Sequence, residues 1–148
     1  WAKQNPDLLK RMINEGHEIG NHGYDHKYHS KLNLEDNRKE IIRTEMVIKE
    51  IAGIKTRLFA PPYGDFNKTT LQAAQSLGYK TIMWSIDTID WRRDGAHNIT
   101  ERVLKNPHNG AFILMHPTED TVKALPGIIN QLGQGGYQIG TISDLLAE

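Results

Sequence analysis

Apolar positions along the chain follow two kinds of pattern, which predict alternating helices and strands. Helical spacing of apolar residues predicts helices over residues 6–15, 34–52, 68–78, 98–105 and 122–132, with a closing helical turn over 143–147. Short apolar runs bounded by polar or turn residues predict strands over residues 18–21, 57–60, 80–86, 111–115 and 137–140.

Residues that favour helix ends mark several of these boundaries. Asn5, followed by Pro6, is a good N-cap for the first helix, and Asn33 and Asn67 cap the next two. Glycines end four of the helices: Gly16, Gly53, Gly78 and Gly133. The buried face of the long helix after Asn33 is assigned to Ile41, Ile42, Met46, Val47, Ile48 and Ile51.

Strands that alternate with helices predict an α/β fold with a parallel sheet, either a barrel or a doubly wound sheet. Residues with unusual chemistry follow four of the predicted strands: His22, the Pro61-Pro62-Tyr63 turn, the Asp87 to Trp91 loop, and His116. The carboxyl ends of parallel strands gather at one face, where the active sites of α/β barrels lie. The sequence therefore predicts a site built from these four segments.

Composition narrows the classes of function. The 148 residues fit one domain, residues 1–148, and the 18 basic and 18 acidic side chains balance. A protein that binds nucleic acid usually has an excess of basic residues, so no nucleic acid is expected as a partner of this chain. No apolar run approaches the roughly 20 residues that span a bilayer. Because cysteine is absent, any metal must be held by His, Asp or Glu.

Four of the seven histidines lie within thirteen residues, and two of them form an H-x-x-x-H pair, His22-Gly-Tyr-Asp-His26. On one face of a helix or turn, two such imidazoles can hold one divalent ion. Solvated loop histidines are the alternative, although the position at a strand end favours the metal. His17 and His29, which flank the pair, are interpreted as structural or exposed residues.

The remaining unusual residues each allow two interpretations. His116 ends an apolar strand and is either a general acid or a histidine bonded to a backbone carbonyl. Asp90 either orients a histidine or caps a loop, while Trp91 either lines a sugar site or packs in the core. Asp87 is a second candidate or a turn residue. The Pro61-Pro62 turn ends a strand and also fixes the direction of the Tyr63 backbone N–H, as oxyanion stabilisation requires.

In order along the chain, these segments resemble the polysaccharide deacetylases of the NodB-homology type, carbohydrate esterase family four. Residues 16–26 (GHEIGNHGYDH) resemble the metal-binding motif of that family, and residues 61–64 (PPYG) resemble its third motif. Asp90-Trp91 resembles the fourth motif and residues 114–116 (LMH) the fifth. The resemblance runs through essentially the whole chain and implies an irregular (β/α) barrel that is incomplete at the N-terminus.

The resemblance also implies roles for site residues. His22 and His26 would be two of three ligands to a divalent metal, for which zinc is the leading candidate. His116 would be the general acid and Leu114 would line the acetyl pocket. Among the other motif residues, Asp90 would be catalytic, and Pro62, Tyr63 and Trp91 would bind substrate.

The implied activity is metal-assisted removal of N-acetyl groups from a cell-wall or chitin-like glycan, peptidoglycan or chitooligosaccharide. The family's opening Thr-Phe-Asp-Asp motif, which supplies the base and the third ligand, is expected upstream of Trp1. Ala60 stands where the family usually has arginine, and Gly23 where it has serine or threonine. These departures leave a second hypothesis open, a deacetylase-fold protein that binds glycan without efficient turnover.

Ala60 and the phrases at residues 84–91 (WSIDTIDW) and 113–118 (ILMHPT) resemble a branch associated with spore-forming bacilli. An extracellular or cell-envelope location is implied by the resemblance alone. The sequence leaves the oligomeric state, the glycan and the metal open.

Overall fold

The computed structural model describes residues 1–147, in which the chain divides into two compact units, one over residues 1–83 and one from residue 84 onward. The prediction of a single domain stays a prediction. Each unit combines helices with one short pair of parallel strands, so the predicted α/β alternation holds within each. No helix among these residues is both long and apolar enough to cross a membrane.

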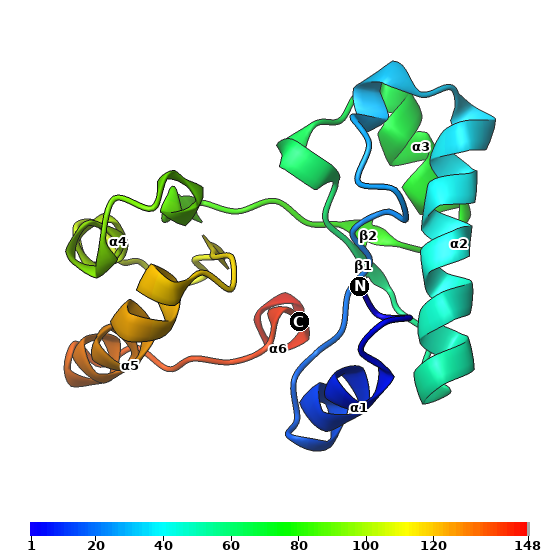
Figure 1. Ribbon diagram of the computed structural model, residues 1–148. Helices are drawn as coiled ribbons and strands as arrows, with labels where there is room; N and C mark the ends of the chain where they lie inside the picture. Colours follow the sequence, from blue (N-terminus) through cyan, green and yellow to red (C-terminus); the bar gives the residue numbers. More distant parts are fainter. Residues whose placement is uncertain (148) are drawn as a thin grey trace. The chain divides into compact units, whose positions relative to one another are not determined.

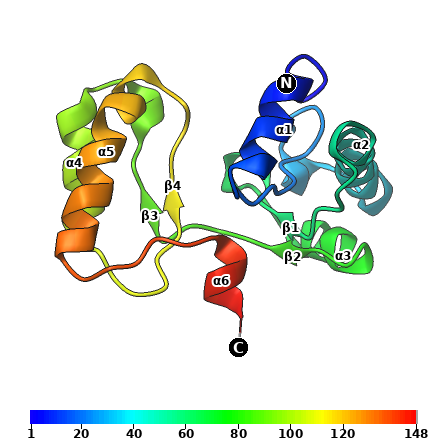
Figure 2. The ribbon, with the colours of Figure 1, turned by 90° about the horizontal axis from the view of Figure 1, so that it is seen from below.

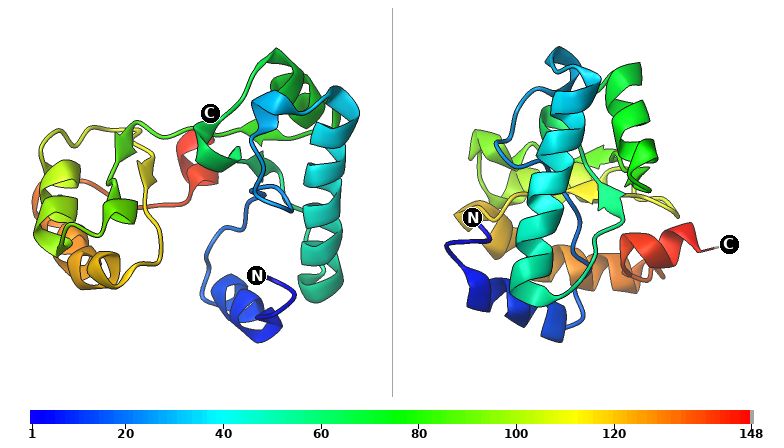
Figure 3. Two further views of the ribbon diagram at one scale, coloured as in Figure 1. Left: turned by 45° about the horizontal axis from the view of Figure 1, so that its top comes forward. Right: turned by 90° about the vertical axis from the view of Figure 1, so that its right-hand side faces the viewer.

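The first unit is built on β1 (Leu58–Phe59) and β2 (Lys80–Thr81), which pair in parallel, with Asn21 adding a single parallel bridge to Phe59. Its helices are α1 (Pro6–Asn14), α2 (Leu34–Ala52) and α3 (Lys68–Ser76), with 3₁₀ turns η1 (His29–Lys31) and η2 (Pro62–Gly64). The helices α2 and α3 lie side by side (Figures 1 and 3). Four buried side chains form the core of this unit: Ile41, Phe59, Ala74 and Tyr79.

The predicted caps of α2 and α3 are confirmed. The Asn33 side chain accepts a hydrogen bond from the backbone N–H at the third position of α2, and Gly53 ends the helix in a left-handed conformation. Asn67 and Thr70 form a capping box at the start of α3. Asn5 makes no cap bond to α1; its amide donates instead to the Trp1 carbonyl, so the prediction of a good cap there was wrong.

The buried face of α2 differs from the predicted one. Ile41, Val47 and Ile48 are buried, whereas Ile42 is 38% and Met46 65% exposed. Two polar residues of the same helix are buried in their place, as shown by the relative exposures of Asn37 (0%) and Glu40 (3%). Because hydrophobic spacing detects only apolar side chains, it could not find a helix face that buries hydrogen-bonding groups.

The second unit pairs β3 (Ile86–Asp87) with β4 (Ile113–Leu114) in parallel. It also contains the 3₁₀ turn η3 (Asp90–Arg92) and the helices α4 (Ala96–Leu104), α5 (Glu119–Gln134) and α6 (Ile142–Leu146). The helices α4 and α5 pack against each other beside these strands (Figure 2). Six buried side chains form its core: Ile86, Ile99, Val103, Ala124, Ile128 and Leu132.

Several predicted boundaries were wrong. The run over residues 80–86 is two strands, one in each unit, and residues 18–21 contribute only the bridge at Asn21. Residues 137–140 form no strand. The helix predicted over 122–132 begins at Glu119, because Thr118 accepts a hydrogen bond from the backbone N–H of Thr121 and caps it.

Candidate functional site

His22 lies in the first unit, beside the end of β1. The Asn21 N–H donates to the Leu58 carbonyl at 2.8 Å, and the Ala60 N–H donates to the Asn21 carbonyl at 3.0 Å. The Nδ1 atom of His22 lies 2.6 Å from the Ala60 carbonyl oxygen. Because a carbonyl can only accept, this nitrogen carries the hydrogen, and the lone pair of the neutral ring is on Nε2.

His26 lies beside His22, with 4.9 Å between the two ring centroids and an edge-on geometry. Its backbone is left-handed, with φ of 52°. Both imidazoles are exposed. The structure therefore brings together the two histidines that the H-x-x-x-H spacing predicted as neighbours, and it presents both rings to solvent.

The buried carboxylate of Glu40, a residue of α2, holds the segment that links His22 to His26. Its Oε2 atom accepts the backbone N–H groups of Tyr24 at 3.1 Å and Asp25 at 2.7 Å, and its Oε1 atom accepts the Lys27 ammonium at 3.0 Å. Residues 22–29 are called the histidine loop below. The sequence reasoning missed Glu40, whose only signal was a charged residue next to the apolar Ile41 of α2.

His29 is fully buried and has a structural role, as expected. Its Nδ1 atom lies 2.7 Å from Oδ1 of Asn37, whose amide donates to the carbonyls of His29, Leu32 and Asn33. The Asn37 oxygen must therefore accept, and His29 Nδ1 donates. Burial lowers the pKa of His29, partly offset by the Asn37 hydrogen bond. A Cβ built on Gly23 would lie 3.0 Å from the His29 Nε2.

The Pro61-Pro62 turn places Tyr63 against the histidine loop. Both prolines are buried, and Tyr63 has φ of 60° and ψ of 7°, an unusual conformation for a residue with a side chain. Its ring lies edge-on to His26 at 4.6 Å and stacks on Tyr28 at 4.2 Å. His22, His26, Pro62 and Tyr63 thus form one cluster in the first unit.

Asp90 and His116 form a second cluster, in the second unit. Asp90 follows β3, His116 follows β4, and parallel pairing brings the two strand ends together. The His116 Nδ1 lies 2.7 Å from Asp90 Oδ1, while the other oxygen accepts the Thr121 hydroxyl at 2.7 Å and the His116 backbone N–H. Asp90 is fully buried, whereas the His116 side chain is 47% exposed.

The electrostatics of this pair favour an ionised Asp90. Burial is the largest single influence and raises the pKa of the carboxyl, but it is outweighed by hydrogen bonds from the His116 backbone, the His116 ring and the Thr121 hydroxyl. The net effect holds the pKa of Asp90 below its usual value. The pair is therefore a buried carboxylate that orients an exposed imidazole, which is one of the two interpretations left open for Asp90.

Three residues near this pair, Trp91, Leu114 and Asp87, differ in their exposure and in their hydrogen bonds. Trp91 is 59% exposed, with the Arg92 guanidinium 5.3 Å from its ring, so it does not pack in the core. Leu114 is partly buried, and its carbonyl accepts the Thr88 hydroxyl. Asp87 accepts the backbone N–H of Ile89 at 2.8 Å, as a turn residue does.

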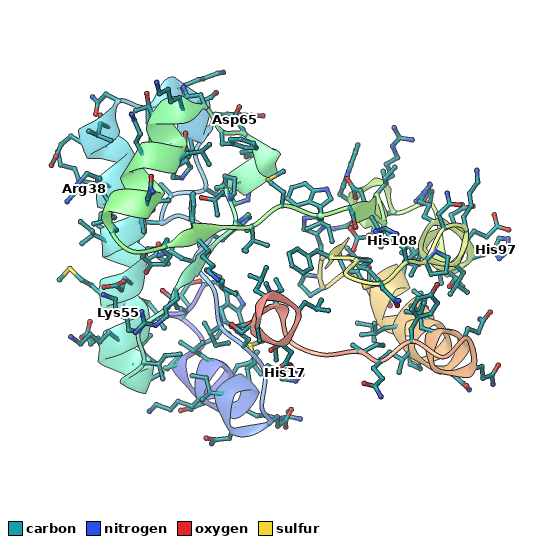
Figure 4. All side chains as sticks on the ribbon, turned by 180° about the vertical axis from the view of Figure 1, so that it is seen from behind. His17, Arg38, Lys55, Asp65, His97 and His108 are labelled. Carbon is teal, nitrogen blue, oxygen red and sulfur yellow. The ribbon has the colours of Figure 1, made fainter. Side chains whose placement is uncertain are left out.

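The other histidines do not extend either cluster. His17 is exposed after α1, His97 projects from α4, and His108 lies in the loop before β4, 3.0 Å from the Ser85 hydroxyl (Figure 4). Over residues 1–147, no three His, Cys, Asp or Glu side chains are grouped closely enough to hold a metal ion. His22 and His26 are thus a pair of donors rather than a complete ligand set.

Several known proteins are similar to this chain in sequence and in fold. The chain is 40% identical over its full length to the uncharacterized protein YlxY of Bacillus subtilis, of which it covers 46%. It is 37% identical to a peptidoglycan-N-acetylglucosamine deacetylase of Bacillus cereus, with 97% of this chain and 54% of that protein aligned. The chain thus spans about half the length of these two relatives.

A solved structure, of a CE4 family pseudoenzyme from Bacillus anthracis, matches with a TM-score of 0.96 and 37% identity over 100% of this chain and 53% of that one. Such neighbours confirm the predicted fold class, the irregular (β/α) barrel of the polysaccharide deacetylase type. The sequence profile described as polysaccharide deacetylase matches residues 1–82, which is more than half of the chain. The chain belongs to the polysaccharide deacetylase family.

Proposed function

We propose that the protein containing this chain is a metal-dependent hydrolase that removes N-acetyl groups from peptidoglycan or a related cell-wall glycan. Several relatives are named peptidoglycan deacetylases, acting on N-acetylglucosamine or N-acetylmuramic acid residues. The observation that carries the proposal is the Asp90–His116 pair. A protein that only binds glycan does not need a buried carboxylate that orients an exposed imidazole.

Hydrolysis of an N-acetyl group needs a proton at the leaving nitrogen. Water adds to the acetyl carbonyl, the C–N bond breaks, and acetate and a free amine form. We assign the proton transfer to His116: its Nδ1–H is engaged by Asp90, so a proton on Nε2 is the one that can be delivered. The ionised Asp90 stabilises the charged imidazolium before transfer.

His22 and His26 are the proposed ligands of a divalent ion, zinc in the first instance. The Ala60 carbonyl fixes the tautomer of His22 and leaves the lone pair on Nε2, as the outer partners of metal-bound histidines commonly do. Bound there, the ion would polarise the acetyl carbonyl and activate water. The third ligand and the base would be the carboxylates of the opening motif that the family resemblance implies.

The remaining site residues are assigned to substrate binding. The fixed Tyr63 turn, entered through Pro62, presents its backbone N–H for the oxyanion that forms when water adds. The half-exposed indole of Trp91 offers an apolar wall to a sugar ring, and Leu114 lines the pocket for the acetyl methyl group. An extracellular or cell-envelope location follows from a cell-wall substrate.

A specific observation supports a second candidate, a glycan-binding protein with little turnover. Ala60 replaces the arginine usual in the family, and its carbonyl accepts a hydrogen bond from Nδ1 of His22. The similar Bacillus anthracis protein is described as a pseudoenzyme, and a mutant of it, 36% identical to this chain with a TM-score of 0.96, as having restored enzymatic activity. In that similar protein, mutation is thus described as turning a pseudoenzyme into an active one.

Acetate release separates them directly. It is measured on peptidoglycan and on N-acetylated chitooligosaccharides, with metal content determined on the same samples, for this chain and for the complete product of its gene. Release that requires both metal and His116 supports the hydrolase. Bound metal with no acetate from either substrate, together with glycan binding, supports the second candidate.

A further inference from the structure

Four aromatic rings form a continuous column in the first unit. His22 contacts His26 at 4.9 Å between ring centroids, His26 contacts Tyr63 at 4.6 Å, and Tyr63 stacks on Tyr28 at 4.2 Å with 12° between the ring planes. Three of these rings belong to groups assigned above to metal and oxyanion. Tyr28 has no such assignment, and it closes the column.

Two members of the column are held in strained backbone conformations. His26 has φ of 52° and Tyr63 has φ of 60°, in the left-handed region that side chains with a Cβ disfavour. Such conformations persist only where the surrounding structure over-determines them. The strained residues lie in two different segments, and the contact between their rings is one of those that join the segments.

Tyr28 is anchored well enough to provide that support. It precedes η1, and its neighbour His29 is fully buried and hydrogen-bonded to Asn37 of α2. The Tyr28 ring is nearly parallel to the Tyr63 ring, and the Lys31 ammonium lies 4.7 Å from its centroid. The Tyr28 ring is therefore held by an anchored backbone segment. It stacks on the exposed side chain of Tyr63, the residue whose backbone is strained.

We propose that Tyr28 is a positioning residue, which by stacking on Tyr63 fixes the direction of the Tyr63 backbone N–H and the orientation of the His26 imidazole. Tyr28 touches neither substrate nor metal in this role and acts through Tyr63. The consequence for turnover rests on the proposed function, whereas the orientation of His26 is a property of the folded chain alone.

Three variants test the role of Tyr28. Tyr28→Phe keeps the ring and removes the hydroxyl, whereas Tyr28→Leu removes the ring. Tyr24→Leu is the matched control, since Tyr24 lies on the same loop with the Arg43 guanidinium 3.7 Å from its ring centroid but stands outside the column. Thermal unfolding checks that all three fold.

The first readout needs no activity. Ring currents from Tyr63 shift the ring protons of His26, which are followed in histidine-labelled, metal-free protein by NMR and assigned with His26→Gln. We expect Tyr28→Leu to move the His26 resonances, and Tyr28→Phe and Tyr24→Leu to leave them in place. Unmoved His26 resonances in Tyr28→Leu would overturn the proposal, as would an equal movement in Tyr24→Leu.

The second readout is kinetic, on the complete gene product. Misplacing a catalytic group by a fraction of an ångström lowers turnover more than substrate binding, so Tyr28→Leu should lower kcat roughly tenfold with little change in KM. Tyr28→Phe, which keeps the stacked ring, should have the kcat of the parent protein. If the parent protein releases no acetate while the His26 resonances still move, the proposed function fails and the role of Tyr28 stands. An active parent with unchanged kcat in Tyr28→Leu overturns the catalytic part of the role.

Discussion

Asp90 accepts hydrogen bonds from both the backbone and the ring of His116, so one buried carboxylate fixes the position and the tautomer of one exposed imidazole. The Asp90→Asn variant keeps the shape but offers one oxygen and an NH₂ group to these donors. We expect kcat/KM for deacetylation to fall by about 10²–10⁴-fold. Bound metal should stay unchanged, as metal analysis of the same sample would show.

The matched control is Asp87→Asn, which changes a carboxylate bonded to the backbone N–H of Ile89. It should leave turnover within a few-fold of the parent. A comparable loss of kcat/KM in both variants would contradict the assignment of Asp90 to His116.

Asp90 should also make the protein sensitive to acid. Its pKa is held below the usual value in the folded chain. Its ionised form therefore contributes stability that is fully present above the pKa that Asp90 has in the unfolded chain. That contribution is lost as pH falls through the folded value. The free energy of unfolding, measured by denaturant titration between pH 7 and pH 3, should fall more for the parent than for Asp90→Asn. Parallel pH profiles would show that Asp90 has no such role.

Local rules located much of the site in the sequence. Residues that follow neighbouring parallel strands lie at the same edge of the sheet. This rule predicted that His116 lies beside Asp90, and His22 beside the Pro61-Pro62 turn. The same rules missed the buried polar residues of α2, because the amide of Asn37 and the carboxylate of Glu40 are stabilised by hydrogen bonds to groups in the segment that precedes the helix. Hydrophobic periodicity carries no signal for such bonds, and so Met46 was assigned to a buried face that it does not occupy.

Gly23 should tolerate no side chain. Its φ is +74°, and a Cβ there would lie 3.0 Å from Nε2 of His29, a buried ring that Asn37 holds in place. We expect Gly23→Ala to lower the free energy of unfolding by about 2–4 kcal/mol, from the left-handed backbone and the steric contact together. Chemical denaturation measures the difference.

Gly16→Ala separates the two causes, because Gly16 has φ of +86° and nothing within 4 Å of a built Cβ. It should cost only about 1 kcal/mol, the backbone part alone. Equal losses in the two variants would show that the His29 ring moves aside. The same contact gives a physical reason why this chain has glycine after His22.

His22→Ala and His26→Ala should each abolish stoichiometric binding of a divalent ion, because either change leaves one imidazole in place of two. Metal content after dialysis against zinc measures the effect, with His17→Ala, an exposed histidine outside the loop, as the control. Metal content that is unchanged in both variants would rule out the proposed ligands. His116→Ala should retain the metal and lose acetate release.

Glu40 should control the metal site without touching the ion. Glu40→Gln keeps an acceptor for the backbone N–H groups of Tyr24 and Asp25 but turns an NH₂ group toward the Lys27 ammonium, so two donors would face each other. We expect a loss of about 1–3 kcal/mol in the free energy of unfolding. Because the histidine loop is then less firmly held, affinity for zinc, measured by competition with a chromophoric chelator, should fall about 10–100-fold.

Glu35→Gln is the control for Glu40→Gln, since Glu35 lies on the same helix with a side chain 70% exposed and only a 3.8 Å ion pair to Lys39. It should change neither stability nor zinc affinity measurably, because exposed ion pairs contribute little. A Glu40→Gln protein that loses stability but binds zinc as the parent does would show that the histidine loop keeps its geometry without the buried carboxylate. The orientation of His22 and His26 would then depend on other contacts, among them those with the Ala60 carbonyl and the Tyr63 ring.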